Sequence, residues 1–256
     1  MPPRERTGTK WLGLLLGGLL LSSGCATRGP THVYLTTAAS PAVHDLGPSP
    51  ARIADAVKSG EQALGLAYDF NTDHLFVRIA PAQFIRVIER PSGKILREMK
   101  LPRALQATAS ADLAIRSSDR HLFAVHPDGR SVVELTLFGA TIRRVELSGL
   151  AGSIRGLAYD QRGGRLLILS ATADRGQVGA VSPDGNVTYY VTLAAAVSPV
   201  SLGYDSDAQH YFVPLADGRS LGEFDAAGNL LSTRAQDGAD AITAIDAGPR
   251  SLVRVF

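Results

Sequence analysis

The chain has 256 residues, of which 45% are hydrophobic, 20% charged and 6% aromatic. This composition is typical of a globular protein and excludes a disordered chain or a protein with several membrane spans. Three of the 26 basic residues and one of the 24 acidic residues lie in the first ten positions, so the rest of the chain has a formal charge of zero. A neutral chain has no general electrostatic affinity for nucleic acid or for an anionic membrane surface. The single Cys excludes an intramolecular disulfide and a Cys-rich metal site.

The first 24 residues have the three-part layout of a secretory signal peptide. Arg4, Arg6 and Lys10 make the beginning basic. Residues 11–21 are apolar or glycine, and small residues lead from there to Cys25. The apolar run is much shorter than the ~20 residues that a membrane-spanning helix needs, so a permanent transmembrane anchor is disfavoured.

The segment Leu21-Ser22-Ser23-Gly24-Cys25 resembles the lipobox of bacterial lipoproteins. The resemblance implies cleavage before Cys25 and attachment of a diacylglyceryl group to its sulfur. The family usually has Leu three positions before the Cys, where this chain has Ser22. The sorting rules of the family associate a residue other than Asp after the Cys, here Ala26, with the outer membrane. The alternative is ordinary signal cleavage near Ala26 without lipid.

The segment after the leader is expected to connect the anchor to a folded domain. Residues 25–30 are predicted to be a short tether, and residues 31–256 the domain. Ala51–Lys58 is predicted to be a short helix or a linker, and little helical periodicity occurs elsewhere.

An internal repeat follows. Five segments each consist of an apolar strand, a largely polar turn of five residues and a second apolar strand. In every segment the second strand begins six positions after the last residue of the first strand. The segments begin at Leu64, Asp112, Gly156, Leu202 and Ile242. This constant spacing indicates one structural unit used five times.

A second hairpin follows in the first four units, with Gly at or beside its turn. Gly tolerates positive φ and Pro presets its own φ, so turns such as Pro-Asp-Gly favour hairpins. Four strands in about 45 residues make one blade of a β-propeller. The sequence therefore predicts an all-β propeller fold, with blades near 64–102, 112–148, 156–194 and 202–235.

The fifth unit, 241–256, has room for only two strands. The apolar segments His32–Thr37 and Ala42–Leu46 flank a Ser-Pro turn and are expected to supply the other two. Residues 31–47 would then complete the last blade, close the ring and remove unpaired strand edges that invite aggregation. We therefore expect five four-stranded blades. The alternative is that residues 26–50 form a flexible tether and leave the last blade half built.

The pattern of a strand ending in Tyr-Asp, five residues and then Leu-Phe-Val is similar to repeats of the bacterial YVTN and NHL-like propeller families. The similarity spans most of residues 64–256 and is loose outside the first hairpin of each unit. It implies a propeller used mainly for binding, with enzymes such as lactonases among its relatives. It transfers no catalytic residue, because no active-site motif of these families matches.

Four carboxylates are expected at the ends of the innermost strands, on one rim of the propeller. They are Asp69, Asp160, Asp205 and Asp246, and Arg116 takes the fifth place. Carboxylates around a narrow channel could hold Ca²⁺, which prefers about six to eight oxygen ligands. Alternatively, each Asp accepts backbone N–H bonds within its own turn, and Arg116 supplies a competing cation. The sequence predicts no cofactor, with Ca²⁺ as the alternative.

Three Arg residues are expected on the opposite rim, in the turns between second and third strands. Arg130, Arg175 and Arg219 come from adjacent blades and could grip a carboxylate or phosphate. The alternative is an exposed Arg beside each hairpin turn. The first blade offers only Arg78, so the ring is incomplete.

The remaining polar residues indicate no enzyme class. His74, His121 and His210 end equivalent turns and are features of the repeat. No HExxH, GxSxG or P-loop motif occurs. The only Trp, Trp11, lies in the leader, which weakens a carbohydrate-stacking site.

The sequence favours a lipid-anchored propeller that acts in the cell envelope as a non-catalytic binding or assembly module. The expected partners are an envelope protein or a small ligand, and the membrane through a lipid on Cys25, without nucleic acid. The expected location is the bacterial outer membrane, facing the periplasm or the outside. The alternatives are a metal-assisted hydrolase or lactonase that uses carboxylates at the channel mouth, and a purely structural envelope protein.

Overall fold

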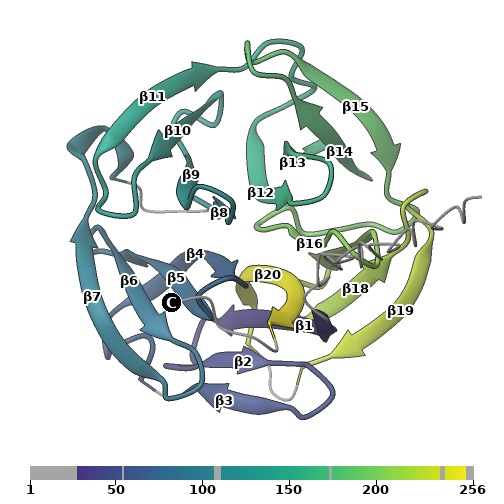
Figure 1. The fold of residues 1–256 in the computed structure, drawn as a ribbon. Coiled ribbons are helices and arrows are strands. Elements are labelled where there is room, and N and C mark those ends of the chain that lie inside the picture. Colours follow the sequence, from purple (N-terminus) through teal and green to yellow (C-terminus); the bar gives the residue numbers. More distant parts are fainter. Residues whose placement is uncertain (1–27, 54, 107–110, 173–174, 237–239, 252–256) are drawn as a thin grey trace, which may run out of the picture.

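The computed structural model describes residues 28–53, 55–106, 111–172, 175–236 and 240–251. In this part of the chain, twenty strands form five antiparallel sheets of four strands each. The sheets are arranged in a ring around a central axis (Figure 1). The expected fold, a β-propeller with five four-stranded blades, is confirmed.

Each of the first four blades runs along the chain from the centre of the ring outward (Figure 1). Blade 1 consists of β4 (Gln62–Asp69), β5 (His74–Ala80), β6 (Phe84–Glu89) and β7 (Lys94–Lys100). Blade 2 consists of β8 (Leu113–Arg116), β9 (His121–Val125), β10 (Ser131–Leu135) and β11 (Thr141–Glu146). Blade 3 consists of β12 (Ile154–Asp160), β13 (Arg165–Thr172), β14 (Arg175–Val181) and β15 (Val187–Thr192). Blade 4 consists of β16 (Gly203–Asp205), β17 (His210–Pro214), β18 (Ser220–Phe224) and β19 (Leu230–Ala235).

Burial explains why inner and outer strands differ in sequence. Inner strands pack against neighbouring blades on both faces, so they are apolar along most of their length. Every residue of β4 except Gln62 is buried. The outermost strand of a blade faces solvent, and every residue of β19 is exposed. The hydrophobic core therefore lies between adjacent blades.

Blade 5 joins the first and the last of the described strands. Its order from the centre is β20 (Ile242–Ser251), β1 (Arg28–Thr37), β2 (Val43–Asp45) and β3 (Ala51–Ile53). The expected completion of the last blade by N-terminal strands is thus confirmed.

The division of strands within blade 5 was predicted wrongly. β20 runs through the turn expected at 247–251, and the N-terminal segment supplies three strands instead of two. The reason is the length of β1, which pairs with β20 from Thr37 opposite Ile242 to Arg28 opposite Ser251. Backbone hydrogen bonds to β1 hold the end of β20 in an extended conformation.

Two further expectations for the N-terminal segment need correction. Ala51–Lys58, predicted as a short helix or a linker, begins with β3, because Val43 and Ile53 pair across β2 and β3. Residues 28–30, expected in the tether, belong to β1. The propeller therefore begins only three positions after Cys25.

A buried ion-pair cluster fastens blade 1 to the segment that leads from blade 5. The fully buried Arg86 donates from Nη1 to Oε2 of Glu61 (2.8 Å) and to the carbonyl of Ala56 (2.7 Å). Its Nη2 donates to Oε1 of Glu98 on β7 (2.7 Å). Burial acts to raise the pKa of Glu61, but the hydrogen bonds from Arg86 outweigh burial and lower it. The carboxylate is therefore ionised and fixed beside the guanidinium.

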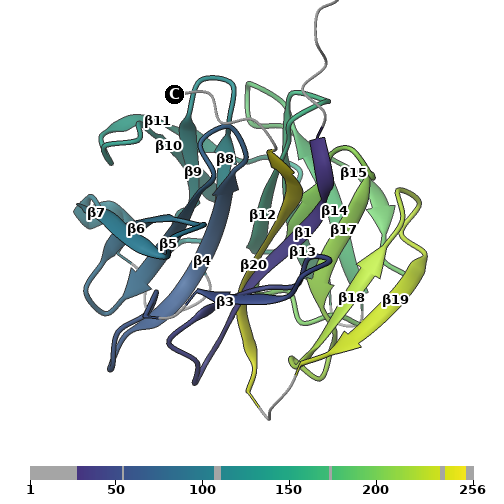
Figure 2. The same ribbon diagram turned by 60° about the horizontal axis from the view of Figure 1, so that its bottom comes forward.

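The propeller has two rims. The first rim carries the turns between first and second strands of each blade, and the second rim carries the turns between second and third strands. Because Arg28 pairs with Ser251, β1 begins and β20 ends at the first rim. Figure 2 shows this rim at the top and Figure 1 views it from the front.

Candidate functional site

The centre of the ring is filled by the protein's own polar side chains. Asp112, just before β8, is fully buried, and its Oδ2 accepts the backbone N–H of Leu157 (2.9 Å) and of Leu202 (3.1 Å). It also accepts the hydroxyl of Ser201 (2.9 Å), whose Oγ accepts the N–H of Ile245 (2.8 Å). The innermost strands have one unpaired edge, so these side chains satisfy backbone groups that would otherwise be buried without partners.

A second buried carboxylate lies on the other side of the channel. Asp246 accepts the N–H of Tyr68 at Oδ2 (2.6 Å) and that of Ala247 at Oδ1 (2.8 Å). Burial raises the pKa of Asp246 well above its ordinary value, and it raises that of Asp112 to about 8. The channel thus favours neutral carboxyl groups.

Two glycines make room for this network. One position of the repeat, four residues before the Asp or Arg that ends the first strand, differs among the five units. In chain order it is Gly65, Asp112, Gly156, Ser201 and Ile242. A Cβ on Gly65 would lie 2.8 Å from Cα of Asp112, and one on Gly156 would lie 2.8 Å from the backbone N of Leu202. Such contacts are too short for real Cβ atoms. Glycine at two of the five positions therefore lets Asp112 and Ser201 reach the centre.

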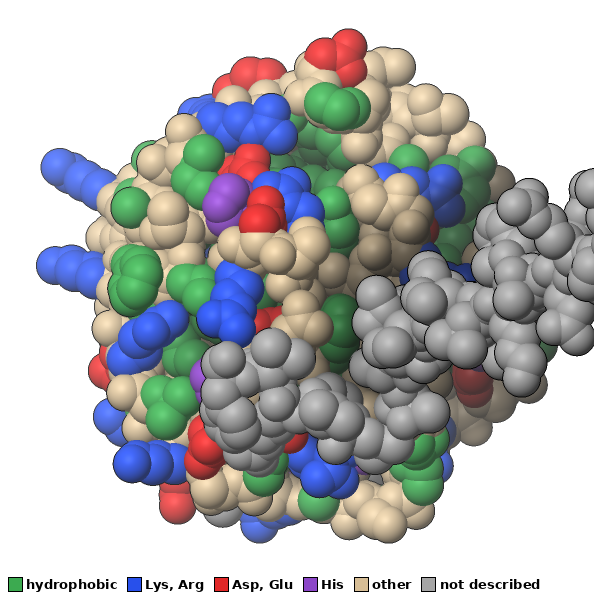
Figure 3. All heavy atoms as spheres, in the orientation of Figure 1, with side chains coloured by type: hydrophobic (Ala, Val, Ile, Leu, Met, Phe, Trp, Pro, Cys, Tyr) green, Lys and Arg blue, Asp and Glu red, His purple; other side chains and the backbone are tan. Residues whose placement is uncertain are grey.

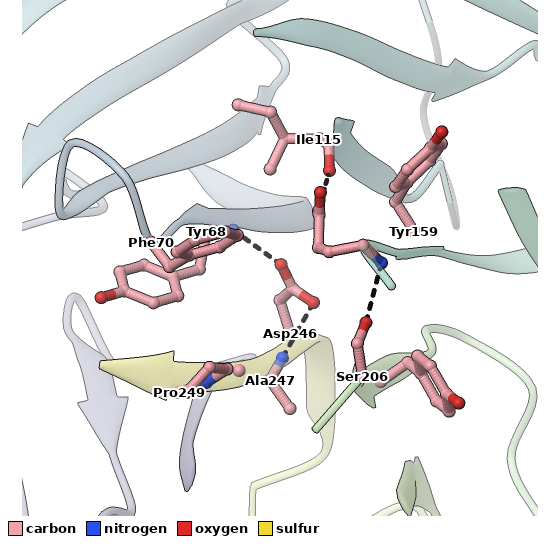
Figure 4. A pocket seen from close by; sticks show the side chains of 11 residues that line it. Tyr68, Phe70, Ile115, Tyr159, Ser206, Asp246, Ala247 and Pro249 are labelled. Carbon is pink, nitrogen blue, oxygen red and sulfur yellow. Dashed lines mark hydrogen bonds between the residues drawn. The ribbon is translucent and has the colours of Figure 1, made fainter. Parts of the chain in front are cut away.

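The channel ends on the first rim in a small mouth, shown in Figure 4. Gln161 lines this mouth; its side chain donates to the carbonyl of Ile115 (2.6 Å), and its backbone N–H donates to Oγ of Ser206 (2.8 Å). Residues 246–249 of β20 form another wall. The remaining space is about 20 Å³, which holds a single water-sized group. Among the described residues, this mouth therefore has room only for a water-sized group.

The predicted rim carboxylates are satisfied separately. Asp69, Asp160 and Asp205 end inner strands, and each accepts the backbone N–H two residues further on, at 3.1, 3.2 and 2.8 Å. These are the contacts of Asx turns. Asp246 instead lies within β20, as described above. Over the residues whose positions are described, no group of three or more His, Cys, Asp or Glu side chains could hold a metal ion.

The three predicted Arg residues lie on the second rim and are all exposed. Arg130 and Arg219 stand in hairpin turns, where their backbone N–H donates to the Asp two residues earlier (2.7 and 2.9 Å). Arg175 begins β14. Arg78 is fully buried and donates to the carbonyl of Val125 (2.9 Å), so it does not extend this set.

The repeated His residues pair with Glu on the neighbouring strand. Nδ1 of His121 lies 2.7 Å from Glu134, and Nδ1 of His210 lies 2.8 Å from Glu223. His74 stands opposite Glu89 in the strand register. His121 and His210 thus share one contact with a Glu of the next strand, while His74 stands in a different register to Glu89.

A groove of about 280 Å³ lies between blades 2 and 3. Its apolar lining consists of Phe123, Val132, Val145, Leu147, Leu166 and Val181. Three basic side chains, Arg116, Arg143 and Arg165, also line it. Figure 3 shows a hollow with hydrophobic side chains at its bottom in the upper part of the first rim, with Lys or Arg side chains beside it. The groove is thus both apolar and cationic.

One buried carboxylate holds two of these arginines. Glu134 accepts Nη2 of Arg116 (2.6 Å) and Nε of Arg143 (2.7 Å), in addition to its contact with His121. Burial acts to raise the pKa of Glu134, but these donors outweigh burial and lower it, so the side chain is anionic. Glu134 lies behind the groove, whose lining contains no acidic residue.

Arg116 also lies beside two aromatic rings. Its guanidinium carbon lies 5.1 Å from the ring centre of Phe123 and 5.9 Å from that of Tyr159. The two rings are stacked with centres 5.7 Å apart. Stacking and ion pairing together fix Arg116 at the inner end of the groove.

Only one feature of the sequence points to this groove. Arg116 interrupts the series of Asp residues at the ends of the first strands. Arg143 and Arg165 could not be grouped with it, because they lie on β11 and β13 of different blades and meet only through the packing of blade 2 on blade 3.

Comparison with known proteins supports the fold. No protein-family model matches the chain, and no curated protein matches it. A chain in the crystal structure of a nidogen/laminin complex is 14% identical over 88% of this chain and 100% of that chain, with a TM-score of 0.60. A protein of unknown function from Bacteroides caccae is 11% identical over 86% and 99%, with a TM-score of 0.45. The first similarity shows the fold alone, and the class defined here is a five-bladed β-propeller with a narrow channel mouth and a groove between two blades.

The predicted lipidation residue, Cys25, lies outside the described residues, as does the whole predicted leader. Among the residues that are described, the search for a helix able to cross a membrane finds none.

Proposed function

We propose that the protein is a lipid-anchored β-propeller of the bacterial cell envelope, related to the YVTN and NHL-like propellers, that acts as a non-catalytic binding or assembly module. Its partner is an envelope protein or a small ligand, and its location is the outer membrane. The observation that carries the binding role is the contrast between a narrow channel mouth, lined by Asp246 and Gln161, and a larger apolar groove with three arginines in its lining.

The start of β1 determines how an anchor on Cys25 would orient the propeller. Three residue steps separate Cys25 from Arg28, and an extended chain spans at most about 11 Å over that distance. Arg28 lies at the first rim. A lipid on Cys25 would therefore hold the first rim close to the membrane surface, and several acyl chains, at ~0.8 kcal/mol for each buried CH₂, would make the attachment nearly irreversible.

Lipid attachment is tested by growing cells with a labelled fatty acid and isolating the protein. We expect label in the wild-type protein and none in a Cys25→Ala variant, which should appear in the soluble envelope fraction. Equal labelling of both proteins, or none in either, would contradict the anchor.

Binding is tested by mild crosslinking in the envelope, followed by affinity isolation and mass spectrometry. We expect a stoichiometric partner that is reduced by Arg143→Gln and kept by Arg144→Gln. Arg144 is the matched control because it pairs with Asp128 (2.6 Å) and does not line the groove. Enzyme-like turnover of a substrate by the purified protein would contradict the non-catalytic role.

A further inference from the structure

We propose that the groove between blades 2 and 3 is a site for a small amphiphilic carboxylate, with its apolar body against the groove wall and its carboxylate on Arg143. This inference deepens the proposed binding function and rests on it for the use of the groove. It does not depend on the lipid anchor.

The size of the groove sets the size of the ligand. A cavity of about 150 Å³ lined by apolar side chains holds benzene. The groove, at about 280 Å³, therefore has room for two fused rings or an aliphatic chain of similar volume. It lies just below the range of ~300–1,000 Å³ that is usual for larger ligands.

The lining sets the polarity of the ligand body. Leu166 and Val181 of blade 3 face Val132 and Val145 of blade 2 across the groove. Phe123 adds an aromatic surface that is already stacked on Tyr159. Removing an apolar surface of the ligand from water is favoured here by about 25 cal/mol for each Å² buried.

The arginines set the charge of the ligand. Arg143 uses Nε for Glu134 (2.7 Å) and Nη1 for the carbonyl of Pro183 (3.3 Å). Arg165 uses Nε for Oδ2 of Asp160 (3.1 Å). Within the described part of the chain, the other terminal nitrogens of these two side chains donate to no protein acceptor.

Both arginines are also accessible, since their side chains are 48% and 45% exposed. The ion pair with Glu134 holds the head of Arg143 in place, whereas the guanidinium carbon of Arg165 lies 5.1 Å from the ring centre of Tyr190. A carboxylate in the groove can accept from the remaining N–H groups of Arg143. A cationic ligand is disfavoured, because the groove lining contains three arginines and no acidic residue.

The test uses three probes of one shape: 2-naphthoate, the neutral 2-naphthamide and the cationic 2-naphthylmethylammonium. Binding to the protein as isolated from cells is measured by isothermal titration calorimetry. We expect 2-naphthoate to bind at least tenfold more tightly than the amide, and the cation not to bind. Arg143→Gln should weaken the binding of 2-naphthoate about tenfold, as expected for the loss of one charge-assisted hydrogen bond.

The matched control is Arg144→Gln, which changes the neighbouring residue on β11 and should leave the affinity unchanged. Circular dichroism of each variant checks that the fold is retained. Equal binding of the three probes, or equal effects of Arg143→Gln and Arg144→Gln, would overturn the proposal. A protein partner captured through Arg143 without any binding of 2-naphthoate would also overturn it while supporting the proposed function.

Discussion

Asp112 shows how one residue at the channel centre couples stability to pH. Its carboxyl is fully buried, and burial raises its pKa from 3.8 to about 8. Folding therefore favours the protonated form. The stabilisation is complete below about pH 4 and is lost progressively as the pH rises toward about 8, because only the unfolded chain ionises freely in that interval.

We expect Asp112→Asn to remove this loss. Asn keeps an oxygen that accepts from Leu157 and Leu202 but cannot ionise, so its stability relative to the wild type should increase by about 1 kcal/mol for each pH unit between pH 5 and 7. Urea unfolding midpoints across this interval measure the difference. Asp217→Asn, at an exposed turn, should give a difference that does not depend on pH. A constant difference for Asp112→Asn would show that this carboxyl is ionised in the fold.

Gly156 is a residue whose hydrogen atom is required by the packing of the next blade. A Cβ there would meet backbone atoms of Ser201 and Leu202 at 2.8 Å. We expect Gly156→Ala to destabilise the protein by about 1–3 kcal/mol, because the backbone of blade 4 must shift. Gly248→Ala is the control, since its Cβ would meet only Cδ1 of Tyr68 at 3.8 Å. Thermal unfolding of both variants tests this, and equal midpoints would contradict the role of Gly156.

At the scale of strands, the regular part of the repeat was predictable and the irregular part was not. The spacing of six between strands identified the first hairpin of blades 1 to 4, since Asp or Arg ends one strand and an apolar residue begins the next. The same rule failed at residues 247–251, where pairing with β1 overrides the local preference of Gly248 and Pro249 for a turn. A local sequence pattern cannot reveal the pairing of two strands that are far apart in the chain.

The candidate site was less predictable than the fold for the same physical reason. His121 was recognised in its repeat position, but its partner Glu134 lies 13 residues away on the next strand. Arg143 belongs to an exposed outer strand and was indistinguishable from other surface residues. Only the packing of blade 2 on blade 3 places it beside Arg165 in a groove.

At the scale of the whole molecule, the pairing of β1 with β20 closes the ring. Val33 and Ala247 are directly opposite and belong to the same hydrophobic cluster. We expect a Val33→Cys/Ala247→Cys disulfide, made in a Cys25→Ala background, to raise stability by up to about 4 kcal/mol, because it closes a loop of most of the domain.

The comparison is between the oxidised and reduced forms of this variant in chemical unfolding. Single replacements at either position should show no difference between the two conditions. An oxidised form that is no more stable than the reduced form would mean that opening of blade 5 does not accompany unfolding.

The same pairing fixes the order in which the ring can be completed. β1 leaves the ribosome before every other described strand, yet its inner partner β20 follows all of them. Contacts so distant in sequence form late in folding. If the chain is exported, as we propose, this delay would keep the propeller open until β20 has also crossed the membrane. The topology that makes the finished ring stable therefore also makes its closure one of the last steps of folding.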